Sequence, residues 1–143
     1  MIKRIAAAAF AVLMLAACGK SEFRMDATPV FAEVTAKNAA ADATASGAIT
    51  VSEGECVVIS SNIKKGAVNI MFKDHTGNIE LNESFDGSGF SSYTITPGEY
   101  DVTAAVTEKA TGTITVLVLE EGGFDEQNFD LESAVEAAGG SLN

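Results

Sequence analysis

The stretch "TPGEYDVTAAVTEKATGTITVLVLEE", residues 96–121, decides the fold class of this chain. In its first half polar and apolar residues alternate, and one face of the extended chain carries Tyr100, Val102, Ala104 and Val106. In its second half the apolar face continues with Ile114, Val116 and Val118. A repeat of period two is typical of a strand with one buried face. The glycine-containing "EKATG" between the halves predicts that they pair as an antiparallel hairpin.

The residues that lead into this stretch predict two local features. Pro97 and Gly98 fit the central pair of a type II turn, in which glycine takes the positive φ of the third position. Tyr100 follows in the place of a tyrosine corner, whose hydroxyl bonds to backbone a few residues upstream. All three are interpreted as structural residues.

Residues 48–95 are predicted to form further short strands, broken by Gly, Asn and Asp. "AVNIMFKD", residues 67–74, alternates strictly, and "SSNIKKG" before it is interpreted as a connection. "DHTG", residues 74–77, predicts a turn with Gly77 at positive φ, after which Ile79 and Leu81 share one face. About seven strands over residues 48–121, with no helical period between them, predict an all-β antiparallel sandwich of Ig-like or jelly-roll type.

Composition and charge limit the classes of partner. The chain has 143 residues, of which 47% are hydrophobic, so one domain with a packed core is expected. Its 20 acidic and 9 basic residues leave a formal net charge of −11. An acidic surface repels nucleic-acid phosphates and anionic lipid headgroups. The composition therefore predicts no nucleic-acid partner, argues against membrane binding through a polybasic patch, and suits a cation or a basic protein.

The first 18 residues, "MIKRIAAAAFAVLMLAAC", have three parts. Lys3 and Arg4 are followed by an apolar run over residues 5–15, and two alanines precede Cys18. This is the architecture of a secretory signal peptide, here over residues 1–17. A transmembrane helix is the alternative, but crossing a bilayer takes about 20 apolar residues and this run is shorter.

The end of this segment, Leu-Ala-Ala-Cys at residues 15–18, resembles the lipobox of bacterial lipoproteins. The resemblance implies cleavage between Ala17 and Cys18 and a covalent diacylglycerol on the sulfur of Cys18. Several acyl chains hold a protein stably on a bilayer, at about 0.8 kcal/mol per buried methylene. The implied location is a membrane surface on the extracytoplasmic side. Loss of two basic residues with the signal peptide would change the net charge from −11 to −13.

Residues 18–47, rich in Ala, Thr, Ser and Asp, are predicted to be the lipidated N-terminus and a flexible tether. A short helix is the alternative for residues 29–40, with Thr28 as its N-cap and Pro29 in its first turn. Cys56 lies in an apolar run without a partner for an intrachain disulfide, so a small buried hydrophobe in a strand is predicted.

Residues 122–143 are predicted to be an acidic tail that contains a short helix. Asp130 fits the N-cap, and Leu131 and Val135 form an apolar i,i+4 pair. Calcium is the alternative role, because a hard cation prefers several oxygen ligands. The candidate ligands do not have the spacing of a known calcium loop; they are Asp125, Glu126, Asn128 and Asp130.

Three runs are also similar to those of uncharacterised small lipoproteins of anaerobic Gram-positive bacteria: "EGE…VVIS…N…KG" at 53–66, "PGEYDV" at 97–102 and "TEKATGTITV" at 107–116. The likeness implies fold and location and brings no catalytic residue. His75, the only histidine, lies in a predicted turn, and one histidine with one cysteine after Cys18 does not make a zinc site. No nucleophile-elbow motif is present.

The sequence therefore favours a non-enzymatic, lipid-anchored module that interacts with a protein partner or serves the cell envelope structurally. The alternative is a module that binds a small ligand, a carbohydrate or calcium at the cell surface. A hydrolase with paired carboxylates is a third hypothesis, because such pairs are common in an acidic chain.

Overall fold

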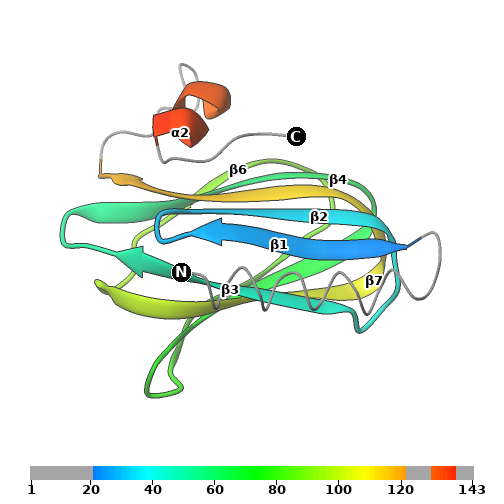
Figure 1. The fold of residues 1–143 in the computed structure, drawn as a ribbon, viewed down its shortest axis with the longest axis horizontal. Helices are drawn as coiled ribbons and strands as arrows, with labels where there is room; N and C mark the ends of the chain where they lie inside the picture. The colour runs from blue at the N-terminus through cyan, green and yellow to red at the C-terminus, as the bar shows by residue number, and fades with distance from the viewer. Residues whose placement is uncertain (1–20, 122–129, 138–143) are drawn as a thin grey trace.

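The computed structural model describes residues 21–121 and 130–137 of the chain. They form an antiparallel β-sandwich followed by one short helix (Figure 1). The predicted all-β sandwich is confirmed. Its elements are β1 (Glu22–Thr28), β2 (Phe31–Ala39), β3 (Thr44–Val51), β4 (Glu55–Asp74), β5 (Ile79–Phe85), β6 (Ser88–Tyr93), β7 (Gly98–Glu120) and α2 (Leu131–Ala137).

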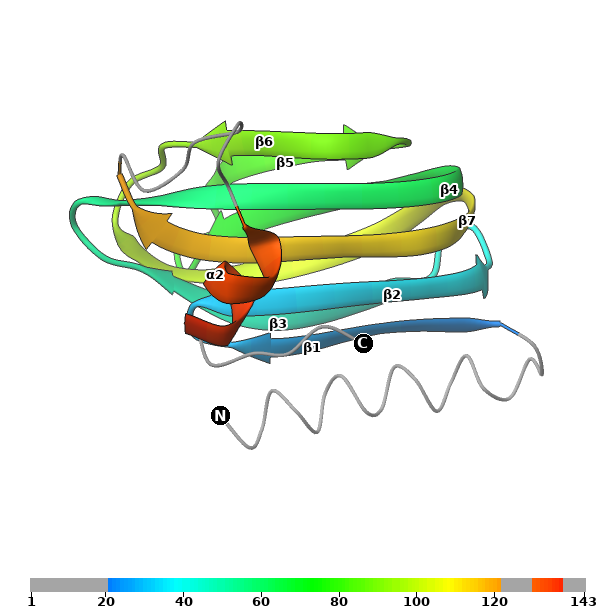
Figure 2. The same cartoon turned by 90° about the horizontal axis from the view of Figure 1, so that it is seen from above.

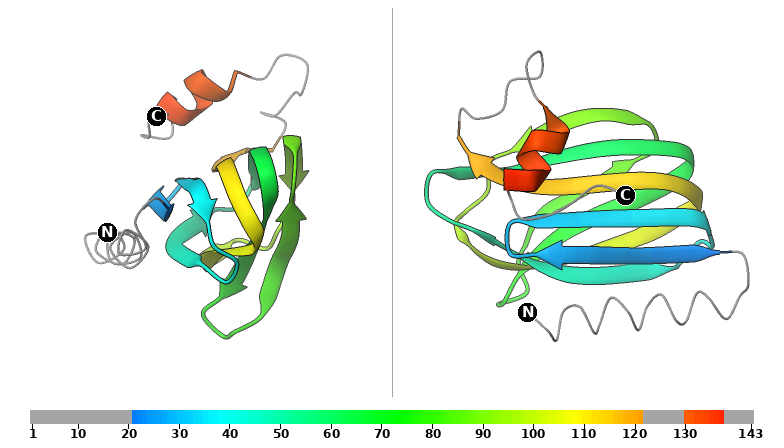
Figure 3. Two further views of the ribbon diagram at one scale, coloured as in Figure 1. Left: turned by 90° about the vertical axis from the view of Figure 1, so that its right-hand side faces the viewer. Right: turned by 45° about the horizontal axis from the view of Figure 1, so that its top comes forward.

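Two long strands, β4 and β7, build both layers of the sandwich, because each runs through the bend that joins the layers. The first layer has the order β1-β2-β7-β4-β6 and uses residues 110–120 of β7 and 55–63 of β4. The second layer has the order β3-β7-β4-β5 and uses residues 98–108 and 67–74. Figure 3 shows the two layers facing each other, with β1 and β3 close together on one side.

The bend is possible because two glycines lie where the strands come close. Gly66 has a φ of 76°, and a Cβ built on it would lie 2.1 Å from the carbonyl oxygen of Lys109. A Cβ on Gly112, whose φ is 150°, would lie 2.3 Å from the carbonyl oxygen of Asn62. Any side chain at either position would therefore collide with backbone. Register shifts between residues 63 and 68 mark the bulges that turn the strands here.

The main core lies between the layers and follows the alternation that the sequence predicts. Each fully buried aliphatic or aromatic side chain contributes about 1.5–3 kcal/mol relative to an exposed one. The inward residues of β7 are Tyr100, Val102, Ala104, Val106, Ile114, Val116 and Val118, and those of the second half of β4 are Val68, Ile70 and Phe72.

A second, smaller apolar cluster lies on the outer face of the first layer. The helix α2 covers this face over β2, β7 and β4 (Figure 2). The helix contributes Val135, which is fully buried, and Leu131, which is half-buried, as the predicted i,i+4 pair requires. The buried residues of this cluster are Phe31, Cys56, Val58, Leu117 and Val135.

The tether predicted for residues 18–47 is wrong from Glu22 onward. Phe23 and Met25 in β1 are fully buried, and Val34 in β2 is 1% exposed. The helix considered as the alternative for residues 29–40 is wrong as well, because Pro29 and Val30 form the turn after β1 and residues 31–39 form β2. Small residues suit this region because the two layers approach closely: a Cβ on Gly47 would lie 2.9 Å from the Cβ of Ala27. Several of the alanines that suggested a flexible spacer are therefore packing residues, namely Ala32, Ala36, Ala39 and Ala45.

Two predicted breaks in the strands are also wrong. "EKATG" does not make a hairpin, and "SSNIKKG" is not a separate connection, because β7 and β4 are continuous through them. Their glycines permit a bend between layers rather than a reversal of direction. The seven strands consequently extend over residues 22–120 instead of 48–121.

One predicted face is broken by a bulge. Ile79 and Leu81 were expected to lie on the same side of β5, but Ile79 is 52% exposed and Leu81 is 5% exposed. Leu81 pairs with Phe72 and Ile79 pairs with the next residue of β4, Lys73, so the ladder shifts by one residue at Glu80. An extra residue in one strand moves the side chains that precede it to the other face of the sheet.

Candidate functional site

The turn between β4 and β5 is organised by one carboxylate. Asp74 Oδ1 accepts hydrogen bonds from the Thr76 backbone N–H at 2.9 Å, the Thr76 hydroxyl at 2.7 Å and the Asn78 backbone N–H at 2.9 Å. The hydrogen bond from the Thr76 side chain is the largest cause that lowers the pKa of Asp74. Gly77 has a φ of 93°, as predicted for this turn. The arrangement holds a charged Asp74 at the molecular surface.

Tyr100 fixes the segment that leads into β7, at the same end of the sandwich as the Asp74 turn. Its hydroxyl donates to the carbonyl oxygen of Thr96, four residues upstream, as a tyrosine corner predicts. Its ring packs against Phe72 with centroids 5.8 Å apart and an interplanar angle of 53°. Burial, followed by the negative charges of Glu80 and Asp74, raises the pKa of Tyr100, so the hydroxyl stays protonated. Glu80 Oε1 accepts from the Thr96 backbone N–H at 3.4 Å.

The predicted type II turn at Pro97 and Gly98 is wrong. The third position of such a turn has a φ of about +80°, whereas Gly98 has a φ of 159°. Gly98 already pairs with Val51 as the first residue of β7. Pro97 and Gly98 therefore lead directly into the strand, and Pro97 lines the hollow described next.

Two adjoining hollows open between the turn after β4 and the start of β7. The first has a volume of about 310 Å³, and its lining includes Asp74, His75, Glu80 and Tyr100. The second has a volume of about 240 Å³ and is lined by Ala48, Thr50, His75, Glu99, Tyr100 and Asp101. Both are open to solvent, and both include the exposed His75 and Glu99 together with Tyr100. They can accept positively charged or hydrogen-bonding groups of a partner.

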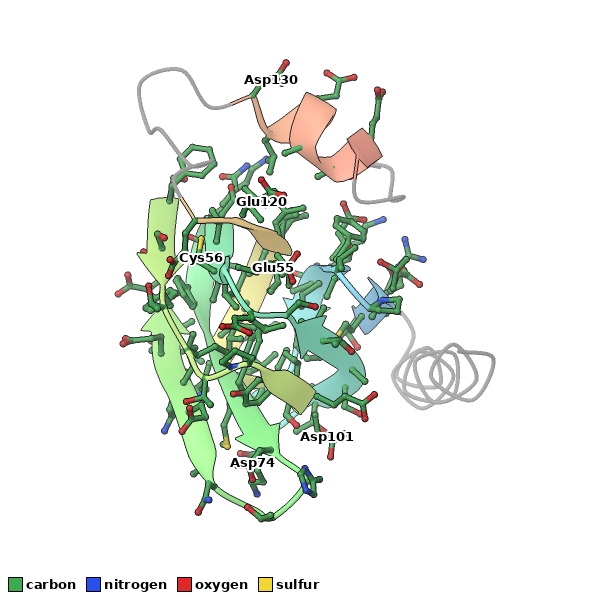
Figure 4. All side chains as sticks on the ribbon, turned by 90° about the vertical axis from the view of Figure 1, so that its left-hand side faces the viewer. Glu55, Cys56, Asp74, Asp101, Glu120 and Asp130 are labelled. Atoms are coloured by element: carbon green, nitrogen blue, oxygen red, sulfur yellow. The ribbon has the colours of Figure 1, made fainter. Side chains whose placement is uncertain are left out.

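These hollows belong to a larger negatively charged region, which we call the acidic end. Strand register brings its members together from β4, β5 and β7 and from the turns that contain Glu53 and Glu121. Figure 4 views the molecule from this end and labels four of them, Glu55, Asp74, Asp101 and Glu120. The full set is Glu53, Glu55, Asp74, Glu80, Glu99, Asp101, Glu120 and Glu121, all exposed or half-buried.

The carboxylates of the acidic end are spread over the surface rather than gathered around one point. In residues 21–121 and 130–137, no group of three or more His, Cys, Asp or Glu side chains is placed to hold a metal ion. The described part of the chain also has no helix long and apolar enough to span a membrane. The acidic end is therefore an extended negatively charged surface.

Cys56 is buried beside α2, as the sequence predicts, and is 4% exposed. The Ser92 hydroxyl points to its sulfur at 3.9 Å. Cys56 belongs to the apolar cluster under α2, with Phe31 and Leu117 among its members. It is therefore a packing residue of the first layer.

Most other predicted site residues lie outside the described ranges. Ala17, Cys18, Asp125, Glu126 and Asn128 are not described. Asp130 is described as exposed, and its Oδ1 accepts from the Glu132 backbone N–H at 3.1 Å. The same residue's carbonyl oxygen accepts from the backbone N–H of Ala134. Asp130 thus caps α2, as predicted.

Sequence reasoning did not find the acidic end. Asp74 had a usable signal, because Asp followed by Thr, Gly and Asn within four residues is typical of a turn closed by a side chain. Glu80, Glu99 and Asp101 had none, since only the pairing of β4 with β5 and β7 brings them together. These three residues lie close together because of the strand register.

The solved structures similar to this chain share little sequence with it. A CBM4 carbohydrate-binding module is 12% identical with a TM-score of 0.41, covering 73% of this chain and 80% of that one. PirA is 11% identical with a TM-score of 0.42, covering 66% and 97%. An oxalate decarboxylase of Bacillus subtilis is 11% identical with a TM-score of 0.36, covering 86% and 33%.

No protein family and no curated protein matches the chain. At the identities of the similar structures, the likeness concerns the fold alone and brings no activity, ligand or partner to this chain.

Proposed function

We propose that this chain is a lipid-anchored β-sandwich protein of the extracytoplasmic membrane surface that acts as a non-enzymatic interaction or envelope-structural module. One observation carries the proposal. The sandwich begins at Glu22, four positions after Cys18, and the first strand is anchored by the fully buried Phe23 and Met25. A domain that begins there leaves residues 1–17 as a separable segment, which is the organisation that the lipobox resemblance implies.

The acidic end supports interaction with a protein rather than with a small molecule. Pockets for small ligands usually measure about 300–1,000 Å³ and enclose most of the ligand. The two hollows, of about 310 and 240 Å³, lie at or below the lower limit and are open to solvent. Exposed carboxylates from separate strands match a basic surface by electrostatic complementarity, which favours specificity and fast association. The proposed partner is therefore a protein with a basic face.

Mass spectrometry of the membrane-extracted protein tests the anchor. We expect an N-terminal Cys18 that carries a diacylglycerol, and we expect Cys18→Ser to remain unprocessed. Cys56→Ser is the matched control, because Cys56 lies in the sandwich and its replacement leaves the lipobox intact. A native protein that retains Met1 without lipid would refute the anchor.

Site-specific cross-linking in intact cells tests the interaction. A photoreactive residue in place of the exposed Glu99 should give a discrete adduct with another protein. The same residue in place of the exposed Glu108, in the middle of β7 where the strand bends at the opposite end of the sandwich, is the control and should not. Equal adducts from the two positions, or none from Glu99, would argue against recognition through the acidic end.

Thermal unfolding of residues 19–143 separates this proposal from the small-ligand alternative. A ligand of the native state must raise its melting temperature in a saturable manner. Calcium, other divalent cations and envelope glycans are the probes, and no shift is expected with any of them. A saturable rise with one of these would replace the protein-interaction proposal by a ligand-binding one.

A further inference from the structure

The charged side chains of the sandwich are divided unequally between its two ends. The end opposite the acidic end is the bend end, where β4 and β7 pass between layers and where β1 and β3 begin (Figure 1). Four of the five lysines in the described residues lie there, and all four are exposed. The charged residues of the bend end are Glu22, Lys37, Asp42, Lys64, Lys65, Asp86, Glu108 and Lys109.

The two ends differ in formal charge because of this division. The four lysines of the bend end balance its four carboxylates, so this end is neutral. The acidic end has eight carboxylates and one lysine, Lys73, so its formal charge is −7. A strand the length of β2, with 9 residues, covers about 30 Å at 3.4 Å per residue. The two charge regions are therefore separated by about three Debye lengths at 0.1 M salt.

The N-terminal chain leaves the sandwich at the bend end. Glu22, the first residue of β1, pairs with Lys37 near the end of β2. Three residues, one of them Lys20, separate Glu22 from Cys18 in the sequence. An extended chain covers at most about 14 Å over four residue steps. A lipid on Cys18 would thus hold the bend end, and not the acidic end, near the membrane.

We propose that the bend end is a membrane-facing surface that lies on anionic phospholipid headgroups and directs the acidic end away from the bilayer. This inference rests on the proposed lipid anchor. Lysines 37, 64, 65 and 109 contact the headgroup region, where one lysine raises the occupancy of the docked state about fivefold. The four carboxylates of the same end match the lysines in formal charge, so the bend end as a whole is not repelled by an anionic surface. Orientation follows from the difference between the ends, because turning the molecule over would bring a charge of −7 to the anionic surface.

The test uses the full lipidated protein bound to vesicles. A donor fluorophore is attached at Ala41→Cys, in the exposed turn of the bend end, or at His75→Cys, in the exposed turn of the acidic end, each with Cys56→Ser. Energy transfer to a headgroup-labelled lipid reports how close each end lies to the membrane. The vesicles contain either phosphatidylcholine alone or phosphatidylcholine with phosphatidylglycerol.

In the anionic vesicles we expect strong transfer from position 41 and weak transfer from position 75. Lys64→Glu should lower the docked fraction about fivefold or more at the same salt concentration. Lys73→Glu makes the same charge change at the acidic end, and it should not lower the docked fraction. The preference should weaken in neutral vesicles and at high salt.

Three outcomes would overturn the inference. Equal transfer from positions 41 and 75 in anionic vesicles would mean that no end is preferred. Equal behaviour in neutral and anionic vesicles would mean that the anchor alone holds the bend end and the lysines do not act. A protein whose mass shows no lipid would remove the proposed function first, and the inference with it, before any vesicle is prepared.

Discussion

The bend end and the acidic end are built in opposite ways. At the bend end the backbones of β4 and β7 continue from one layer to the other, and Gly66 and Gly112 lie against carbonyl oxygens. At the acidic end the chain reverses in separate turns, which hydrogen bonds of Asp74 and Tyr100 hold. Close backbone contact tolerates no added atom, whereas solvent-facing turns tolerate many side chains. Structural constraint is therefore concentrated at the bend end, whereas the turns of the acidic end carry exposed carboxylates.

Alanine at a glycine of the bend end should have the largest effect on stability. Gly66→Ala should lower the free energy of unfolding by about 3 kcal/mol, because overpacking adds to the strain of a positive φ. Gly54→Ala is the matched control: its φ of 82° is close to the 76° of Gly66, but nothing lies within 4 Å of its Cβ.

Denaturant unfolding of residues 19–143 measures both variants. Gly54→Ala should cost about 1–2 kcal/mol, the strain of the left-handed conformation alone. Equal losses for the two variants would show that close approach of β4 and β7 contributes nothing at the bend.

The helix α2 should be able to detach from the sandwich without unfolding the main core. Val135→Asp places a charge in the cluster that buries Cys56, and the helix should detach while the main core remains folded. The labelling rate of Cys56 by a thiol reagent should then rise about tenfold, which corresponds to about 1.4 kcal/mol of lost packing. Glu136→Ala on the exposed side of α2 is the control. Unchanged labelling in Val135→Asp would mean that α2 does not protect Cys56.

Removing the hydroxyl of Tyr100 should weaken the acidic end moderately. Tyr100→Phe keeps the contact with Phe72 and removes the hydrogen bond to the Thr96 carbonyl oxygen. A loss of about 1 kcal/mol in the free energy of unfolding is expected. Tyr93→Phe, at a half-buried ring of β6, is the comparison variant. A Tyr100→Phe variant as stable as the parent would exclude the tyrosine corner as a stabilising contact.

Acid should weaken the turn at Asp74 by a small amount. The pKa of Asp74 is lowered in the folded protein, so its contribution is present above the unfolded pKa of about 4 and is lost as pH falls. Asp74→Asn should therefore be less stable than the parent at pH 7, and the difference should shrink below about pH 4. Melting temperatures of the two proteins from pH 7 to pH 3 measure this difference. A difference independent of pH would assign it to the shape of the side chain and not to its charge.

The predictability of the fold varied along the chain with the size of the side chains. Alternation of large residues such as Phe72, Ile114 and Val116 correctly predicted the strands and the inward faces of β4 and β7. In β1, β2 and β3 much of the buried surface is alanine, which contributes little to a hydrophobic pattern. Ala32 and Ala39 are fully buried all the same, because the layers come close there. Glycine usually indicates a turn in a β protein, but Gly66 and Gly112 instead permit the bends of β4 and β7.

The candidate site was predictable only in part. The Asp74 turn and the Tyr100 hydrogen bond follow from local sequence, since both partners lie within four residues. The acidic end and the bend end do not, because strand pairing collects their charges from positions far apart in the chain. A net charge of −11 predicts repulsion from anionic lipid, but it averages over a neutral end and an end of −7.

The order of residues alone determined the all-β class, the inward faces of the long strands, the cap of α2 and the buried state of Cys56. Each of these depends on periodicity or on contacts between near neighbours. Tertiary structure alone decided that residues 22–47 belong to the core, that β4 and β7 cross both layers, and that lysines and carboxylates separate to opposite ends. These features depend on which strands pair and in what register, and long-range pairing leaves no local signal in the sequence.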